Sequence, residues 1–394
     1  MKKKILILAI VFALLAVLQY VNFGTVKAET ESEIEQNINQ NVVDQLSQLD
    51  FSKLDEILNN LDDSYNMFGT GSFQEKIVEI VNGTYFTSFD NVFSAVLNLA
   101  FDGLVSIMPI LLTIIAVAIL CAIITNLKVS NNGGVNDIVH FVCYSVIILL
   151  IVTALVQIMQ QTYASLSTMK LLMEASFPIL LTLLTAIGAV SSVAIYHPIV
   201  AILSGGVTFI FTNVLYPIFI LSFIFVVISN LSSTVKLNKF NDFLSSMFKW
   251  IVGFILTIFT SFLVIQGISA GKFDSVSIKA TKFAVRSYVP IIGGFISEGF
   301  DFIILSSILI KNAIGVGVLF IVFLIALAPV IKIVIFKLGL QLVSAIIEPM
   351  GNTKLTNFIS SCSKILIYPV VILLGVAFMF LITVALIMTT ANVF

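Results

Sequence analysis

The sequence predicts an all-α fold: a polytopic membrane helix bundle with a small exported helical N-terminal region. Hydrophobic residues make up 59% of the chain and charged residues only 10%, whereas soluble globular domains carry roughly 25% charged residues. A chain with so little charge cannot cover a surface that faces water on all sides. Its apolar runs are continuous rather than alternating, and this pattern indicates spanning helices, not the strands of a barrel.

The first 28 residues have the three parts of a secretory signal peptide. Lys2, Lys3 and Lys4 form a positive start, an apolar run follows from Ile5 to Leu18, and Val26–Ala28 is a small-residue cleavage site. We expect cleavage after Ala28, and an uncleaved anchor helix is the alternative. In both cases residues 29–103 are carried across the membrane.

The exported region, residues 29–103, is acidic and reads as short amphipathic helices. It holds 14 of the 21 acidic residues of the chain. Ser52 with Asp55, and Ser72 with Glu75, have the spacing of a capping box. Gly83 after Asn82 is typical of a helix end. We expect a small helical domain that docks to partners or to the bundle.

Residues 104–394 read as a multi-pass bundle of about seven or eight spans. Proline and glycine interrupt two of the apolar stretches, which suggests possible re-entrant segments near residues 177–192 and 289–300, the arrangement that many transporters use for a midplane site. The span count decides on which side the lysine-bearing loops fall, so the side of the C-terminus stays open. The expected spans are residues 104–127, 138–160, 171–196, 198–229, 250–268, 291–310, 313–336 and 365–389.

Residues 232–250 differ from the spans because apolar and lysine side chains lie on opposite faces. This pattern indicates a helix lying in the membrane interface, with Trp250 in the aromatic belt. An ordinary loop helix is the alternative.

The candidate structural or functional residues lie around the single arginine of the chain. Ionisable groups inside a membrane are costly and therefore often functional, and a guanidinium can satisfy broken backbone carbonyls or a carboxylate. Lys311 could reach Glu298 and Asp301 if a turn intervenes. The alternative role for these charged side chains is to anchor helix ends in the lipid headgroups. The candidates are Arg286, Pro290, Gly293, Gly294, Glu298, Asp301 and Lys311.

Motifs for catalysis, metals and nucleotides are absent from the sequence. His140 and His197 are far apart, no HExxH, GxGxxG or Walker pattern occurs, and the three cysteines read as small apolar residues. No dense basic patch suggests nucleic acid. We therefore expect no enzyme activity, no cofactor and no bound metal.

Several blocks of the sequence occur in the order found in one family. They are "HFVCYSVIILL", "AIYHP", "FKWIVGFILTIFTSFLVIQGISA", "TKFAVRSYVPIIGG", "SSILIKNAIGVGV" and "LAPVIKI". From about Asn98 to Phe394 the chain resembles the stage III sporulation protein AE family, and the signal peptide and acidic helical region fit it too. No catalytic motif defines the family, so the resemblance carries over no site residue.

The resemblance implies a membrane component of a sporulation channel or export complex that links mother cell and forespore and is needed for forespore development. The implied place is the mother-cell membrane around the forespore. The implied partners are other proteins of the same sporulation operon, including a cytoplasmic ATPase and ring-forming membrane proteins. Two alternatives remain: a free-standing secondary transporter or permease with a broken-helix site, and a scaffold with no conduit of its own.

Overall fold

The structure, a computed structural model, describes most of the chain and is helical throughout. Every regular element in the described ranges is a helix, which confirms the all-α prediction. The predicted signal peptide, residues 1–28, lies outside the described residues. The described residues are 41–60, 71–83, 85, 89–126, 133–231, 237–288, 293–350 and 353–390.

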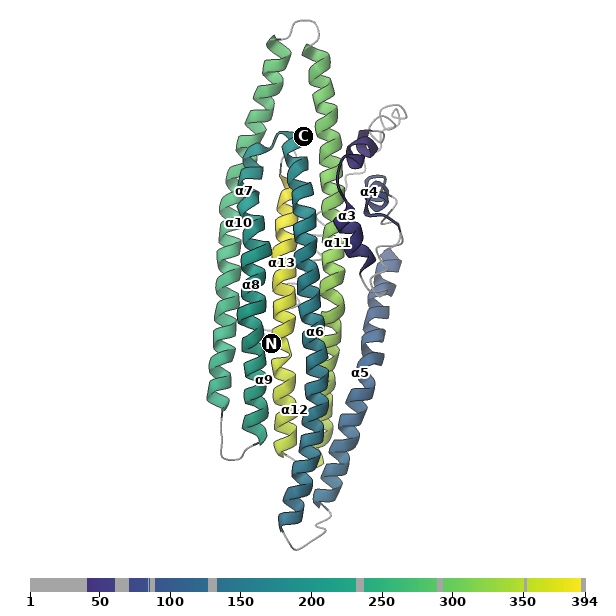
Figure 1. The fold of residues 1–394 in the computed structure, drawn as a ribbon, viewed down its shortest axis with the longest axis vertical. Coiled ribbons are helices and arrows are strands. Elements are labelled where there is room, and N and C mark those ends of the chain that lie inside the picture. The colour runs from purple at the N-terminus through teal and green to yellow at the C-terminus, as the bar shows by residue number, and fades with distance from the viewer. Residues whose placement is uncertain are drawn as a thin grey trace.

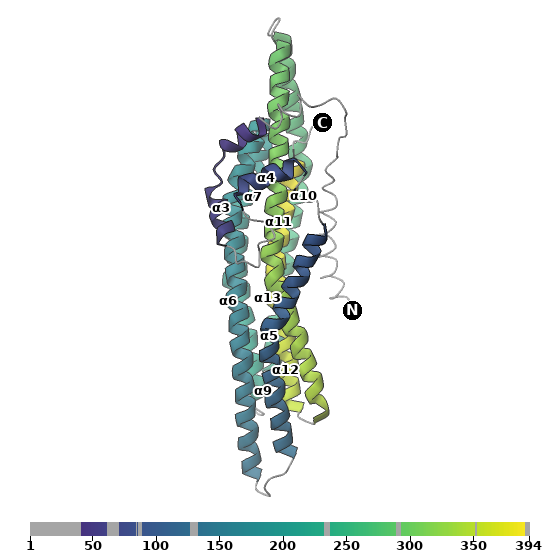
Figure 2. The same ribbon diagram turned by 90° about the vertical axis from the view of Figure 1, so that its right-hand side faces the viewer.

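Long helices run side by side along one axis, with α11 and α13 between the others (Figures 1 and 2). The segment from α7 to α9 is one nearly continuous rod that contains two π-helical turns, η2 and η3. The bounds are α5 Phe89–Asn126, α6 Gly133–Ile187, α7 Val190–Ala201, η2 Ile202–Val207, α8 Thr208–Ile210, η3 Phe211–Leu215, α9 Tyr216–Leu231, α10 Asn238–Tyr288, α11 Gly293–Ile347, η4 Glu348–Met350, α12 Thr353–Ile365 and α13 Ile367–Thr389.

Within the described residues, six helical segments are long and apolar enough to cross a membrane, fewer than the seven or eight that the sequence predicts. The difference arises because pairs of predicted spans merge. Residues 138–160 and most of the predicted span 171–196 belong to the single helix α6, and residues 293–336 belong to α11. Pro178 and Pro329 lie inside these helices without ending them.

A helical hairpin stands where the sequence suggested a re-entrant segment near residues 177–192. Helix α6 continues to Ile187, and the chain then reverses at Gly188 into α7 at the end of the bundle (Figure 1). Gly188 has φ of 88°, a left-handed conformation that glycine adopts without steric cost. The other suggested segment, near residues 289–300, falls where α10 ends at Tyr288 and α11 begins at Gly293.

The predicted interfacial helix over residues 232–250 is not a separate element. Its described part forms the first turns of α10, which continues to Tyr288. Apolar residues follow directly after Trp250, so no breaker ends the amphipathic stretch.

Two short helices, α3 Ser52–Asn59 and α4 Phe73–Val81, lie against α6 and α11. The predicted capping box of Ser72 and Glu75 is present, and Gly83 follows the end of α4 with φ of 71°. The predicted box of Ser52 and Asp55 is wrong. Asp50 accepts from the Ser52 amide instead, and Asp55 accepts a 2.6 Å bond from the amide of Phe73, tying α3 to α4.

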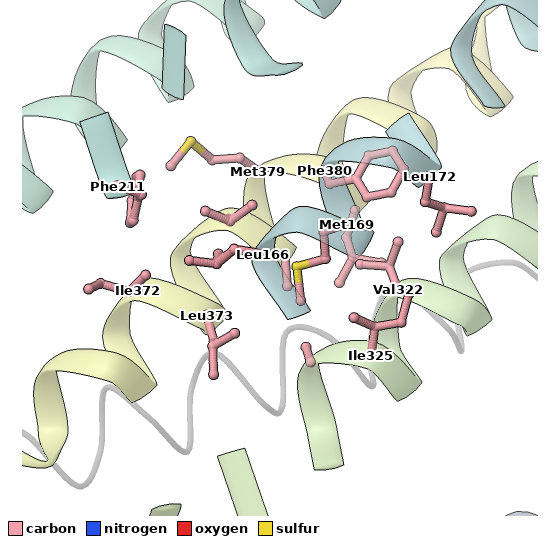
Figure 3. Close-up of a cluster of buried hydrophobic side chains, with 14 of the residues drawn as sticks. Leu166, Met169, Leu172, Phe211, Val322, Ile325, Ile372, Leu373, Met379 and Phe380 are labelled. Atoms are coloured by element: carbon pink, nitrogen blue, oxygen red, sulfur yellow. The ribbon is translucent and has the colours of Figure 1, made fainter. Parts of the chain in front are cut away.

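The centre of the bundle is apolar and closely packed. Side chains from α6, η3, α11 and α13 meet there, including Met169, Phe211, Val322 and Phe380 (Figure 3). Lipid tails are as apolar as these residues, so packing contacts rather than water exclusion hold membrane helices together. Tilted ring contacts such as Phe177 with Phe380, 5.3 Å between centroids, contribute to that packing.

Candidate functional site: a buried polar cluster at the end of the bundle

Asp274 on α10 forms the first half of a polar cluster beside the α6–α7 hairpin. The residue is 1% exposed. Its Oδ1 accepts from the Ser191 amide at 3.0 Å, and its Oδ2 accepts from the Ser192 amide at 2.9 Å and from the Ser192 hydroxyl. These amides are in the first turn of α7, where a helix has unsatisfied N–H groups and a positive dipole end. The Asp274 carboxylate of α10 therefore caps the N-terminus of α7.

The cap is needed because α7 has none of its own. The residue before the helix is Ala189, which makes no side-chain capping bond. Serine, threonine, aspartate or asparagine is preferred at that position because its side chain accepts from the first turn. In this protein the acceptor comes from a residue more than 80 positions away in the chain.

Tyr196 and Thr390 extend the cluster along α7. Tyr196 lies four residues after Ser192, on the same helix face, and its hydroxyl is 2.9 Å from the hydroxyl of Thr390. The Thr390 hydroxyl donates to the Leu386 carbonyl at 2.7 Å. Because that proton is used, the Tyr196 hydroxyl is the donor to Thr390.

Lys311 completes the cluster from α11. It is 0% exposed, and its Nζ donates to the backbone carbonyl of Thr390, at the C-terminus of α13. A cation is favourable at that end of a helix, where carbonyls point outward. The cluster thus joins α7, α10, α11 and α13, with each charged side chain at the helix end of opposite partial charge.

The role of this cluster is structural: its hydrogen bonds hold the ends of four helices together. The Asp274 carboxylate already accepts three hydrogen bonds, and the tyrosine proton is directed to Thr390. Buried polar groups that are satisfied in this way hold one arrangement of the surrounding helices, because any other arrangement leaves them unpaired.

Of the sequence-predicted candidates, Lys311 is the one that the described contacts place in the cluster. Arg286 lies in the last turn of α10, Gly293 and Gly294 open α11, and Glu298 and Asp301 follow on the same helix. Pro290 lies outside the described residues. Nothing in the described structure assigns a role to the arginine.

The expected reach of Lys311 back to Glu298 and Asp301 is wrong. It required a turn between them, and α11 is continuous from Gly293 to Ile347. Asp301 and Lys311 are ten residues apart, which at 1.5 Å per residue is about 15 Å along the axis. The lysine points instead to the end of α13.

A second contact region joins the N-terminal helices to α11. Gly317 leaves room for Phe73 and Ile77 of α4, and a Cβ at this glycine would lie 3.2 Å from Ile77 Cδ1. The Ser307 hydroxyl donates to Gln45 at 2.9 Å. The Tyr85 ring meets Phe320 edge to face, and burial, with Glu79 nearby, raises the pKa of its hydroxyl.

These features define the class of the molecule as a multi-pass, all-helical membrane protein, with polar residues that fasten helix ends. The chain belongs to the stage III sporulation protein AE family, whose model matches residues 72–391. It is 26% identical over 345 residues to stage III sporulation protein AE of Bacillus subtilis (strain 168), a match that covers 87% of this chain and 86% of that relative. The resemblance found in the sequence is thereby confirmed. No solved structure matches the chain.

Proposed function

We propose that the protein is an integral membrane component of a sporulation channel or export complex that links mother cell and forespore and is needed for forespore development. Its place is the mother-cell membrane around the forespore. Its partners are proteins of the same operon, including a cytoplasmic ATPase and ring-forming membrane proteins. Membership of a sporulation family supports the setting, and the length of the bundle supports the role in an assembly.

The bundle is longer than a bilayer is thick. Helices α6 and α11 have 55 residues each, and at 1.5 Å per residue each is about 80 Å long. The hydrocarbon core of a bilayer is about 30 Å thick. The upper parts of α10 and α11 also stand beyond the other helices (Figures 1 and 2). Rigid helices that leave the membrane offer side surfaces to other proteins.

The proposal predicts co-isolation with the other members of the operon. The tagged chain, solubilised in mild detergent from sporulating cells, should bring these proteins down, and cells without the chain should form few spores. The purified chain in lipid vesicles should move no solute by itself. Solute uptake by vesicles that hold only this chain, together with no partner in the pull-down, would favour the secondary transporter and contradict the proposal.

The six spans also suggest an orientation. The acidic region that carries α3 and α4 packs against the upper half of the bundle (Figure 1), and its expected export places that end outside the cytoplasm. The three connections at the lower end carry or adjoin Lys128, Lys236, Lys239 and Lys354, whereas at the upper end only the connection after α10 adjoins basic residues, Lys279, Lys282 and Arg286. The positive-inside rule, which assigns lysine-bearing loops to the cytoplasm, is thus met at all three lower connections and opposed at one upper connection. The C-terminus then lies outside the cytoplasm, because α13 runs upward.

This orientation predicts opposite labelling of two exposed positions. The experiment uses a chain in which Cys121, Cys143 and Cys362 are replaced by serine. One cysteine at a time is then introduced, as Lys279→Cys on upper α10 or as Asn357→Cys on lower α12. With the chain expressed in the cell membrane of growing cells, a membrane-impermeant maleimide should label Lys279→Cys in intact cells. It should label Asn357→Cys only after lysis. The reverse result would invert the proposed orientation.

A further inference from the structure

Two helices at opposite edges of the bundle each carry one uncharged stretch of about the length of a bilayer. In α5 no charged residue occurs from Gly103 to the end of the helix at Asn126, and in α10 none occurs from Trp250 to Gly271. At 1.5 Å per residue the two stretches are about 36 and 33 Å long, and a hydrocarbon core is about 30 Å thick. Helix α5 lies at one edge of the bundle and α10 at the other (Figure 1).

Helix α11, which runs down the bundle, shows how high the α5 stretch lies. A Cβ at Gly103 would lie 3.5 Å from Cγ of Lys332 on α11, and farther down α11 the absence of a side chain at Gly339 leaves room for Leu111. The upper end of the α5 stretch is therefore level with Lys332, and the rest of the stretch lies below it (Figures 1 and 2).

The α10 stretch begins at the height of the upper end of the α5 stretch. The Ser363 hydroxyl donates to the backbone carbonyl of Lys337 at 3.1 Å, and five residues farther along the chain the Tyr368 ring stacks on Phe248 at 4.3 Å. Because α12 and α13 run up while α11 runs down, Tyr368 and Phe248 are level with about Lys332. From there the α10 stretch runs upward (Figure 1). The two uncharged stretches therefore lie end to end along the bundle axis.

At and below this common height the two edges expose opposite chemistry. The Tyr144 ring contacts Phe358 at 5.2 Å, so lower α6 is level with α12. Among the described side chains, α5 below Gly103 and α6 from residue 138 to 150 expose no charge, and the hydroxyls of Ser106 and Thr113 donate to carbonyls of their own helix. By contrast, the first turns of α10, together with α12, expose Lys239, Asp242, Ser246, Lys249, Asn357 and Lys364.

No bilayer perpendicular to the bundle axis fits both edges. Placed around the α5 stretch, its hydrocarbon would cover the lysines of α10 and α12, which is costly. Placed around the α10 stretch, it would leave the apolar lower halves of α5 and α6 in water. An inclined bilayer covers both stretches. Its lower boundary then crosses the middle of the bundle, where α9 exposes Leu221, Ile224 and Ile228 and Lys337 of α11 is half-buried.

The inclination is steep. Contacts lead from α5 to α11, from α11 to α13 and from α13 to α10, which at about 9 Å per helix pair separates the edges by about 27 Å. The centres of the two stretches are about 35 Å apart along the axis. A tilt of about 50° centres both in hydrocarbon, compared with about 20° for an average spanning helix, and snorkelling lysines reduce it. On the α5 side, α4 contacts Gly317, about 22 Å above Lys332, and so lies outside the hydrocarbon with its acidic residues.

We propose that the bilayer crosses the bundle obliquely, and that the face formed by α12 and the first turns of α10 binds the anionic headgroups of the leaflet at the lower end. Three of the four exposed charged side chains described on this face are lysines. Phe240, Phe243 and Trp250 are exposed beside them, and aromatic rings among lysines are typical of the headgroup level. In the orientation proposed above, on which only the identity of this leaflet depends, it is the cytoplasmic leaflet, which carries anionic lipids.

Tryptophan fluorescence tests the inclination, because Trp250 is the only tryptophan of the chain. In a Trp250→Phe background, Leu112→Trp on α5 and Phe243→Trp on α10 place one indole at nearly the same height on the two edges, where the native side chains are 57% and 63% exposed. The purified chain is reconstituted in vesicles of phosphatidylcholine and phosphatidylglycerol whose acyl chains carry bromine near the headgroup or near the terminal methyl. Leu112→Trp should be quenched more by the deep bromines, and Phe243→Trp more by the shallow ones.

A lipid titration tests the headgroup site. In detergent, phosphatidylglycerol should change the emission of Trp250 at a lower lipid concentration than phosphatidylcholine does, by about fivefold for each lysine that takes part. The chain with Lys239→Gln, Lys249→Gln and Lys364→Gln together should lose this difference. Identical titrations of the unchanged chain with the two lipids would refute the headgroup site.

The depth measurement has two outcomes that contradict the inclined bilayer. Equal ratios of deep to shallow quenching at Leu112→Trp and Phe243→Trp, or the reverse order, would mean that the bilayer does not reach lower on α5 than on α10. A Leu112→Trp that the bromines do not quench would place lower α5 outside the hydrocarbon. Quenching in vesicles requires neither the operon proteins nor one direction of insertion, so this failure is distinct from a failure of the proposed assembly role.

Discussion

Replacing Asp274 with alanine should lower the free energy of unfolding of the purified protein by about 2–5 kcal/mol, since each buried donor left without an acceptor costs roughly 1–3 kcal/mol. The carboxylate serves two amides and one hydroxyl of α7, and the substitution removes all three bonds. Asp274→Asn keeps the shape but can offer only one oxygen, so its loss should be smaller. Unfolding by SDS, followed by far-UV circular dichroism in mixed micelles, measures the difference.

Asp242→Ala is the matched control for this experiment. Asp242 lies on the same helix, α10, but is exposed, so its replacement should change the unfolding curve little. If Asp274→Ala unfolds at the same SDS fraction as Asp242→Ala and the unchanged protein, the cap across helices does not stabilise the bundle. The buried polar cluster would then make no measurable contribution to the stability of the bundle.

Replacing Gly317 with leucine should detach α3 and α4 from the bundle. Ile77 and the Phe73 ring already lie within 3.5 Å of where a Cβ would stand, and the rest of a leucine side chain has to occupy their space. Overpacking of this kind costs about 1–3 kcal/mol, and 1.4 kcal/mol is about tenfold in an equilibrium. Limited proteolysis should therefore remove the N-terminal helices about tenfold faster.

Gly253→Leu provides the control for the glycine substitution. A Cβ at Gly253 on α10 would meet nothing within 4 Å, so leucine is accommodated there. The two variants carry the same chemical change in the same kind of helix. Equal rates of N-terminal trimming in both would show that the contact at Gly317 does not hold α4 in place.

Local features were predictable from the sequence because they depend on neighbouring residues. The capping box of Ser72 and Glu75 and the stop at Gly83 follow from spacings of three residues or fewer. The pair Ser52 and Asp55 has the same spacing, but Asp50 stands closer to the helix start and takes the amide. Which of two local acceptors binds is a matter of geometry that spacing does not contain.

Asp274 was missed because its partners are distant in the chain. The available signal was indirect: after Gly188 the sequence begins a helix with alanine and valine, residues that cannot cap it. That gap implies an acceptor from elsewhere without saying which carboxylate supplies it. Lys311 was found because a lysine within an apolar run is costly in a membrane and is therefore a functional candidate. Its partner was not predictable, because every residue has a backbone carbonyl and side-chain identity does not mark the one that is used.

The described residues hold six long apolar helices where seven or eight spans were predicted, for a related reason. Proline and glycine are tolerated inside membrane helices, because neighbouring groups satisfy the freed backbone. Pro178 and Pro329 are interruptions of this tolerated kind, whereas Gly188 is a true end with positive φ. The residues around these positions are similar, so composition alone does not separate the two cases.

The central place of α11 has a consequence for biogenesis. It packs against α4, α5, α6, α10, α12 and α13, yet among the six candidate spans of the described residues it is the fifth in chain order. The four spans made earlier can pair with one another, α5 with α6 and α10 with α7 and α9, but we expect their faces toward α11 to have no partner until it is inserted. Assembly of the bundle is therefore a late event, completed when the last hairpin, α11 with α12 and α13, enters between helices already in the bilayer.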